Sequence, residues 1–396
     1  MRNFNWIVPT RFVFGKGVET QIGAWAKAEG HTRALVVYGG GHVVRSGLLA
    51  AVTGSLEAAG VACVELGGVR PNPEVATVRE GIALAREQKV DLVVPVGGGS
   101  VIDCSKAIAI GARLDRDIWD VFSPEVQAPF SDVLPLAVVL TIPAAGSESS
   151  DSCVISNDEL GLKSAITSDL IRARVAFMDP ELTMSLPAWQ TFAGVTDMCA
   201  HIMERFFSAS EDVVSTDSIA LALLRSVRAE ALKLLRDPND YDARANVMWL
   251  GTLAHNGLAG NGREEDWASH GLEHELSAVD AKVTHGAGLA VIFPAWMRYV
   301  CAERPERFVQ FGREVFGLVA TGDALADAHN AIDALQEFFV SLGMPRYLDE
   351  FGFTRTDVDK FLVGLHENKG DAFGSFKSLT MDDARAIYES AFRPEA

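Results

Sequence analysis

The first half of the chain alternates short apolar, β-branched runs with stretches of helical spacing, and this alternation restricts the possible folds most strongly. Runs that are apolar on both faces are typical of strands buried on both sides, and intervening helices connect such strands in parallel. The expected strands are residues 34–38, 61–66, 91–96 and 136–142, and the expected helices are residues 46–59, 74–89 and 101–112. We therefore predict a mainly parallel, Rossmann-like α/β sheet covered by helices on both faces.

The second half differs from the first in residue composition and in hydrophobic period. From about Ser185, alanine, leucine, arginine and glutamate dominate, and a 3.6-residue period continues nearly to Ala391. A chain of 396 residues is expected to form about two domains. We predict an α/β domain over residues 1–183 and an all-helical domain over residues 184–396. A ligand site is expected in the cleft between the two domains, a common place for such sites.

Composition excludes several classes of partner. The formal net charge of −18 argues against binding to nucleic acid or to acidic membrane surfaces. No apolar run is long enough to span a bilayer, and residues 1–6 lack the organisation of a signal peptide. The five cysteines are odd in number and widely spaced, which favours reduced thiols in a cytoplasmic protein over a disulfide framework.

Histidines and one aspartate between positions 197 and 285 are candidate metal ligands. Asp197 and His201 are four residues apart, as are His270 and His274, so each pair lies on one face of a helix. A single pair of this kind is usually surface decoration or a satisfied buried pair. Two pairs together with His285, which precedes a Gly-x-Gly sequence in an apolar stretch, favour a metal site. A mixed oxygen and nitrogen ligand set suits iron or zinc.

A glycine-rich turn at residues 97–100 follows an expected strand and precedes an expected helix. Such a turn can bring backbone N–H groups against a pyrophosphate at the positive end of the helix. A tight strand–helix turn can also need glycine for packing alone. The turn is not a G-x-G-x-x-G fingerprint, so it does not predict an ordinary Rossmann βαβ unit.

These motifs together resemble the iron-containing (group III) metal-dependent alcohol dehydrogenases. Residues 266–271 and 273–276 are most similar to the branch of butanol dehydrogenases and broad aldehyde reductases, and the resemblance extends from Phe12 to Tyr388. It implies a fold of the dehydroquinate synthase-like type, with Fe²⁺ or Zn²⁺ bound by four ligands. Those ligands are Asp197, His201, His270 and His285. The resemblance gives His274 a catalytic role in relaying the alkoxide proton; orienting His270 or Asp197 is the alternative role.

The resemblance also makes residues 1–183 the dinucleotide-binding domain and residues 184–396 the metal-binding domain, with the active site between them. It further implies a set of cofactor-binding residues. They are Gly97, Gly98, Gly99, Ser100, Asp103, Thr141, Ser147, Ser152 and Lys163. The chain departs from the family at Ala144 and Ala145, where threonines are usual, and at Ser152, where asparagine is common.

A second glycine run, at residues 39–41, bears on the choice of cofactor. Many members of the family carry an aspartate at the position of Gly40, where it accepts hydrogen bonds from the adenosine ribose and repels a 2′-phosphate. Without that carboxylate, and with His42 and Arg45 near the start of the next helix, the loop favours a phosphate. We expect Gly39, Gly40, Gly41, His42 and Arg45 to bind the cofactor and NADP(H) to be preferred over NAD(H). The alternative is that the glycines only form a tight turn and that Arg45 is solvated.

The expected activity is hydride transfer between NADP(H) and a small primary alcohol or aldehyde, assisted by the metal. The rival hypotheses are an NAD-dependent, glycerol-dehydrogenase-like polyol enzyme and a non-catalytic dinucleotide-binding sensor. A dehydroquinate-synthase-like activity would need a cluster of basic residues beside the histidines, which the sequence lacks. Relatives are often dimers that pair through the segment around residues 12–15, so we expect a homodimer. Cys104, Cys153 and Cys199 are expected in the core, and His255 is expected either near the substrate or as a packed or solvated residue.

Overall fold

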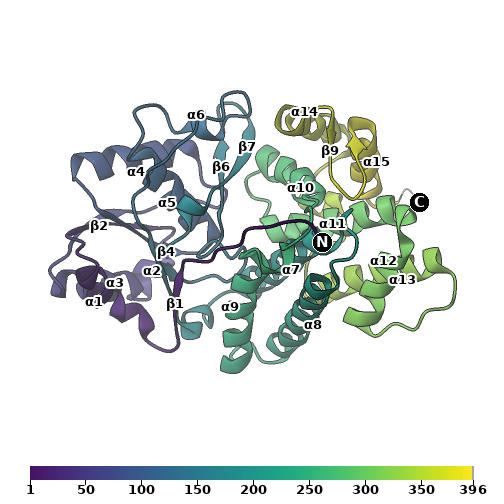
Figure 1. The fold of residues 1–396 in the computed structure, drawn as a ribbon, viewed down its shortest axis with the longest axis horizontal. Helices are drawn as coiled ribbons and strands as arrows, with labels where there is room; N and C mark the ends of the chain where they lie inside the picture. Colours follow the sequence, from purple (N-terminus) through teal and green to yellow (C-terminus); the bar gives the residue numbers. More distant parts are fainter. Residues whose placement is uncertain (395–396) are drawn as a thin grey trace. The chain divides into compact units, whose positions relative to one another are not determined.

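The computed structural model describes residues 1–394 and separates into two compact units (Figure 1). One unit is Ile7–Leu186, and the other combines Pro187–Ala396 with Met1–Trp6. The change of unit at Leu186 lies close to the predicted boundary, but the first six residues differ from the expected assignment. The backbone N–H of Arg2 donates to the carbonyl of Gly262 at 2.7 Å, and Trp6 Nε1 donates to the carbonyl of Asn256 at 3.0 Å. These contacts attach residues 1–6 to the helical unit.

The first unit is built on a six-stranded sheet in the order β1-β8-β5-β4-β2-β3, and every neighbouring pair is parallel. The strands are β1 (Arg11–Phe14), β2 (Arg33–Tyr38), β3 (Ala62–Leu66), β4 (Leu92–Gly97), β5 (Ala137–Leu140) and β8 (Val175–Met178). Its helices are α1 (Ile22–Ala28), α2 (His42–Arg45), α3 (Leu48–Ala58), α4 (Val75–Glu87), α5 (Gly99–Gly111) and α6 (Trp119–Phe122). The prediction of a parallel α/β sheet is confirmed.

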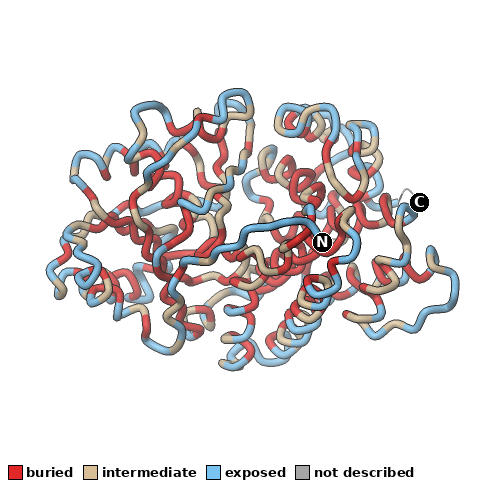
Figure 2. The backbone as a smooth tube through the Cα atoms, in the orientation of Figure 1, coloured by how far each residue is buried: buried red, intermediate tan, exposed pale blue. Residues whose placement is uncertain are grey.

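Burial explains why this sheet forms from these runs. Strands β4, β5 and β8 are buried at every position, as expected for the centre of a sheet covered on both faces (Figure 2). A separate antiparallel hairpin of β6 (Ser152–Asn157) and β7 (Leu162–Thr167) follows β5 and was not predicted.

The second unit is predominantly helical, as predicted. Its helices are α7 (Ala188–Phe206), α8 (Val214–Arg236), α9 (Tyr241–His255), α10 (Ala268–Val279), α11 (His285–Val300), α12 (Pro305–Phe311), α13 (Ala324–Ser341), α14 (Val358–Lys369) and α15 (Met381–Ser390). The exception to an all-helical domain is a two-residue antiparallel pair, β9 (Ala372–Phe373) with β10 (Leu379–Thr380).

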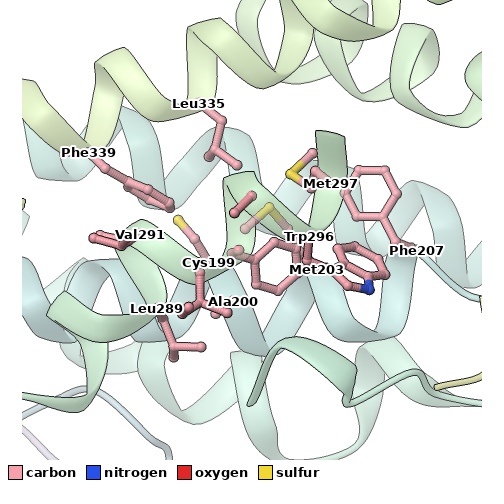
Figure 3. Close-up of a cluster of buried hydrophobic side chains, with 14 of the residues drawn as sticks. Cys199, Ala200, Met203, Phe207, Leu289, Val291, Trp296, Met297, Leu335 and Phe339 are labelled. Carbon is pink, nitrogen blue, oxygen red and sulfur yellow. The ribbon is translucent and has the colours of Figure 1, made fainter. Parts of the chain in front are cut away.

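The apolar core of the helical unit fixes α7 in place. Cys199, Met203 and Phe207 face a buried cluster that also receives side chains from α11 and α13 (Figure 3). Cys199 is 2% exposed, so it is a small core residue as expected, and Cys104 and Cys153 are also buried. The opposite face of α7 is therefore the one available for polar chemistry. Within residues 1–394, no helix has both the length and the apolar character that crossing a bilayer would need.

Candidate metal and cofactor sites

Helix α7 presents three acidic or basic side chains on the face away from its apolar core. Asp197, His201 and Glu204 follow one another at helical spacing, and all three are buried. His270 comes from the first turn of α10, and His285 is the first residue of α11. Helix α11 packs against both α7 and α10. The first turns of α10 and α11 therefore bring His270 and His285 to the polar face of α7.

The three histidines among the four predicted ligands converge on one oxygen atom of the fourth, Asp197. Oδ1 of Asp197 lies 3.3 Å from His201 Nδ1, 3.7 Å from His285 Nε2 and 3.9 Å from His270 Nε2. Asp197, His201 and His270 also form a group whose candidate ligand atoms lie within 4.8 Å of one another. The structure thus brings together the aspartate and the three histidines that the sequence nominated.

Three of these atoms are buried without a hydrogen-bonding partner among residues 1–394. They are Asp197 Oδ1, His201 Nδ1 and His270 Nε2. A buried polar atom without a partner costs free energy, so three such atoms facing one point are best explained by a ligand that completes them. The donor set, one carboxylate and imidazole nitrogens, fits a divalent transition metal.

The surroundings of His201 and His270 shift the pKa values of the two imidazoles in opposite directions. Burial and the neighbouring His255 and His270 lower the pKa of His201 well below its usual value, which favours the neutral form that binds metals. Burial alone would also lower the pKa of His270, but the neighbouring carboxylates of Asp197 and Glu204 outweigh it and raise the pKa to about 9.

Two carboxylates that sequence reasoning missed lie behind the histidines. Glu204 Oε1 is 2.8 Å from His270 Nδ1, and Glu273 Oε2 contacts His285 Nδ1. Both glutamates are 0% exposed. A signal was present in the sequence: Glu204 follows His201 by three residues and Glu273 follows His270 by three, so each shares a helix face with a predicted ligand.

Trp267, just before α10, has a strained backbone. Its φ of 64° places a bulky residue in the left-handed region, where such residues are rare. Its N–H donates to Glu204 Oε2 at 2.9 Å, and its ring centroid lies 4.9 Å from that of His270 and 5.8 Å from that of His201. Strain of this kind persists only where surrounding contacts hold it, and it marks functional sites.

His274 and His255 flank the ligand group on different sides. The His274 ring centroid is 5.3 Å from that of His285, and the side chain is partly exposed. His255, at the end of α9, is buried with its ring centroid 4.1 Å from that of His201, and Arg205 Nη2 lies 3.4 Å from its Nδ1. His255 is therefore a buried neighbour of His201.

The predicted cofactor residues of the first unit follow three neighbouring parallel strands. Gly39–Gly41 follow β2, Gly97–Ser100 span the end of β4 and the start of α5, and Thr141 follows β5. Loops at the carboxyl ends of adjacent parallel strands lie at one edge of the sheet, where open α/β folds bind ligands. Helix α5 has thirteen residues and begins without a side-chain cap, so its first N–H groups can donate hydrogen bonds to a phosphate.

The glycines of this turn also serve packing, as the alternative interpretation held. A Cβ atom on Gly97 would lie 2.6 Å from Val101, and one on Gly98 would lie 2.8 Å from Ile142. A Cβ atom on Gly99 would instead occupy the space beside Ser147 and Ala145, at 3.4 and 3.5 Å. The packing requirement for glycine is therefore strict at Gly97 and Gly98 and weaker at Gly99.

Other predicted cofactor residues contact the protein itself. Asp103 Oδ2 accepts the N–H of Val154 at 3.1 Å, and burial raises the pKa of this carboxyl to about 6 although Lys106 lies nearby. Lys163 Nζ donates to Asn72 Oδ1 at 3.0 Å. The carbonyl of Ser152 accepts from Lys106 Nζ at 2.7 Å. Lys106, which also donates to the carbonyl of Ser150 at 2.9 Å, is a buried support that the sequence interpretation did not assign.

The loop after β2 leaves open space at Gly40, the position expected to distinguish NADP(H) from NAD(H). A Cβ atom on Gly40 would meet nothing within 4 Å, whereas one on Gly41 would lie 2.5 Å from Nη1 of Arg45. The Arg45 guanidinium thus folds back over the glycine run. His42 Nε2 is 3.0 Å from Ser185 Oγ.

Comparison with known proteins agrees with this arrangement. The profile of iron-containing alcohol dehydrogenases matches residues 9–180, and that of the C-terminal domain of the Fe-containing alcohol dehydrogenase family matches residues 191–392. The chain belongs to the iron-containing alcohol dehydrogenase family. The family, the fold class and the classification as an alcohol dehydrogenase, all predicted from the sequence, are confirmed.

Individual relatives cover the full length of the chain. It is 38% identical to NADH-dependent butanol dehydrogenase A of Clostridium acetobutylicum over 393 residues, which is 99% of this chain and 100% of the relative. It is 36% identical to the NADPH-dependent aldehyde reductase YqhD of Escherichia coli strain K12, with the same coverage. The crystal structure of butanol dehydrogenase A from Thermotoga maritima superposes with a TM-score of 0.95 at 36% identity, covering 99% of each chain.

Proposed function

We propose that this chain reduces small aldehydes, and oxidises the corresponding primary alcohols, at a single divalent metal held by Asp197, His201, His270 and His285. The observation that carries the proposal is the convergence of three buried donor atoms without partners and of His285 Nε2 on one point. Fe²⁺ and Zn²⁺ both suit this ligand set, so loading depends on which metal is available. The similarity to butanol dehydrogenase A and to YqhD supports a short aliphatic aldehyde as substrate.

When bound, the metal polarises the carbonyl oxygen as a Lewis acid, and the nicotinamide supplies or accepts the hydride. The protein must keep the ligand nitrogens free of protons, and the lowered pKa of His201 serves that purpose. Reduction of an aldehyde also consumes a proton. His274 is partly exposed beside His285, so its imidazole can exchange protons with solvent and hand one on to the developing alkoxide.

The experiment that tests this activity follows NADPH absorbance when the purified protein meets butanal. Metal-dependent consumption of NADPH with formation of butanol is expected. A non-catalytic dinucleotide sensor would bind NADPH and give no turnover, and a polyol enzyme would turn over glycerol in preference to butanol.

We further propose that the chain prefers NADP(H). Its relatives include both NADH-dependent and NADPH-dependent enzymes, so the proposal depends on this chain's own loop. The loop has no carboxylate at position 40, the space there is open, and Arg45 folds over Gly41. The absence of a negative charge removes the usual barrier to a 2′-phosphate, and a guanidinium can pair with it.

Steady-state kinetics with both cofactors and butanal test this preference. A higher kcat/KM with NADPH is expected for the wild type, and Gly40→Asp should shift the preference towards NADH. The matched control is Gly54→Asp, which adds the same charge at a second exposed position where a Cβ atom meets nothing within 4 Å. Equal or better kcat/KM with NADH in the wild type would refute the preference.

We also propose that the protein is a cytoplasmic homodimer. All five cysteines are free, which suits a reducing compartment. Strand β1 is an edge strand of the sheet, and edge strands are surfaces through which two copies can pair. Analytical ultracentrifugation should give twice the chain mass, and a species of one chain mass would refute the homodimer.

A further inference from the structure

We infer that Glu273 and Glu204 are positioning residues of the metal site: each holds a ligand histidine by Nδ1 so that Nε2 faces the metal. This inference rests on the ligand set proposed above. A carboxylate behind a ligating imidazole fixes the hydrogen on the outer nitrogen and strengthens the inner nitrogen as a ligand. One divalent ion would then be surrounded by three carboxylates: Asp197 as a ligand, and Glu204 and Glu273 behind two of the ligand histidines.

The orientation of the two rings supports the inference. His285 contacts Glu273 through Nδ1 and points Nε2 at Asp197 Oδ1, 3.7 Å away. His270 makes the equivalent pair of contacts, with Nδ1 2.8 Å from Glu204 and Nε2 3.9 Å from Asp197 Oδ1. Two histidines on different helices therefore use the same nitrogen for the same purpose.

Glu204 does more than contact one ring. Its Oε1 also accepts the backbone N–H of His270 at 2.9 Å, and its Oε2 accepts the N–H of Trp267 at 2.9 Å. Both oxygens are used as acceptors for N–H groups. A glutamine could satisfy only one side, because its amide nitrogen would face another donor. A carboxylate is thus required, and it holds both the His270 ring and the strained start of α10.

The Glu273 carboxylate occupies space that a side chain at Gly288 of α11 would otherwise fill. A Cβ atom on Gly288 would lie 2.6 Å from Glu273 Oε1 and 2.7 Å from its Cγ. Gly288 is one turn after His285 on the same helix. The absence of a side chain at position 288 therefore lets the Glu273 carboxylate reach the His285 ring, and Gly288→Ala would displace the carboxylate without removing its charge.

The chain offers a matched control for each change. Glu275 is buried on the same helix as Glu273 and accepts from Asn368 Nδ2 at 2.9 Å. Among residues 1–394 it lies outside both groups of side chains that could hold a metal, Asp197 with His201 and His270, and Glu273 with His274 and His285. A Cβ atom on Gly364 would lie 2.0 Å from Glu275 Oε2, as one on Gly288 meets Glu273. Glu275→Gln and Gly364→Ala therefore reproduce the lost charge and the crowding away from the metal ligands.

The test is the dissociation constant for Zn²⁺, measured on the full-length protein by competition with a chromophoric chelator. Glu273→Gln and Gly288→Ala should each weaken Zn²⁺ binding by about 10- to 100-fold. They should also alter the visible spectrum of the Co²⁺-substituted protein, which reports ligand geometry. Glu275→Gln and Gly364→Ala should leave both readouts close to those of the wild type.

The outcomes separate this inference from the proposal on which it rests. If the wild type binds Zn²⁺, His270→Ala abolishes binding, and both Glu273→Gln and Gly288→Ala bind as tightly as the wild type, then the positioning role is wrong and the ligand set stands. If His270→Ala binds Zn²⁺ like the wild type, the ligand set itself is wrong. Should Glu273→Gln fail to fold, as judged by circular dichroism, Gly288→Ala decides the question alone.

Discussion

Gly286→Ala should remove the metal by separating two helices. A Cβ atom at position 286 would lie 2.0 Å from the carbonyl oxygen of Ala193 and 2.7 Å from its carbonyl carbon, both backbone atoms of α7. Real Cβ atoms are essentially never closer than 3.0 Å to such an atom, so the start of α11 must retreat from α7 by about 1 Å. The neighbouring residue on α11 is His285, and Asp197 lies one turn beyond Ala193 on α7.

A shift of about 1 Å is large for a metal site, where ligand distances are held within about 0.2 Å of their preferred values. We expect metal affinity to fall by at least about 100-fold, the upper end of what outer-shell changes cost. Overpacking should also destabilise the fold by about 1 to 3 kcal/mol. The assay is metal content after dialysis, together with chelator competition and thermal unfolding.

Gly23→Ala is the control for overpacking itself. Its Cβ atom would lie 1.9 Å from the carbonyl oxygen of Ser55, a comparable backbone clash within the sheet unit. This variant should lose similar stability and keep its metal. If Gly286→Ala retained wild-type metal affinity while losing stability, the geometric reasoning on His285 and Asp197 would be refuted.

Two further predictions concern proton relay by His274 and the ion pairs of Asp217. His274→Ala should keep its metal and lose about 10²-fold in rate with a changed pH profile; loss of metal would instead make His274 a ligand or its essential support. Asp217→Ala should cost about 3 to 5 kcal/mol because it leaves the buried charge of Arg263 without its carboxylate partner at 2.6 Å and removes a 2.6 Å partner of the partly exposed Arg307. Burial raises the pKa of Asp217, but Arg307 and Arg263 outweigh it and lower the pKa, so its stabilisation is present at neutral pH and should be lost below about pH 4. Urea unfolding at several pH values measures this, and a difference from wild type that did not shrink in acid would contradict it.

The sequence predicted those parts of the structure that repeat with a simple period. The runs at 34–38 and 91–96 became β2 and β4 because apolar residues on both faces can be satisfied only inside a covered sheet. Asp197 and His201 were found because a spacing of four places them on one helix face. Their convergence with His270 and His285 was expected from family resemblance.

The remaining features depend on contacts distant in sequence. Glu204 and Glu273 looked like ordinary helix glutamates, since a spacing of three from a histidine does not reveal which histidine of another helix each will meet. The attachment of residues 1–6 to the helical unit depends on contacts of Arg2 and Trp6 with a loop some 250 positions away, including an ion pair of Arg2 with Glu264. The left-handed backbone of Trp267 is likewise unfavourable locally, and the hydrogen bond from its N–H to Glu204, 63 positions earlier, helps to hold it.

The most direct test of the metal-centred site removes and restores the ion. The purified wild type should carry about one divalent transition metal per chain. Its NADPH-dependent reduction of butanal should disappear on chelation and return when Fe²⁺ or Zn²⁺ is added. His270→Ala should neither hold the metal nor recover activity. Full turnover by the metal-free wild type, or wild-type metal content in His270→Ala, would contradict the account.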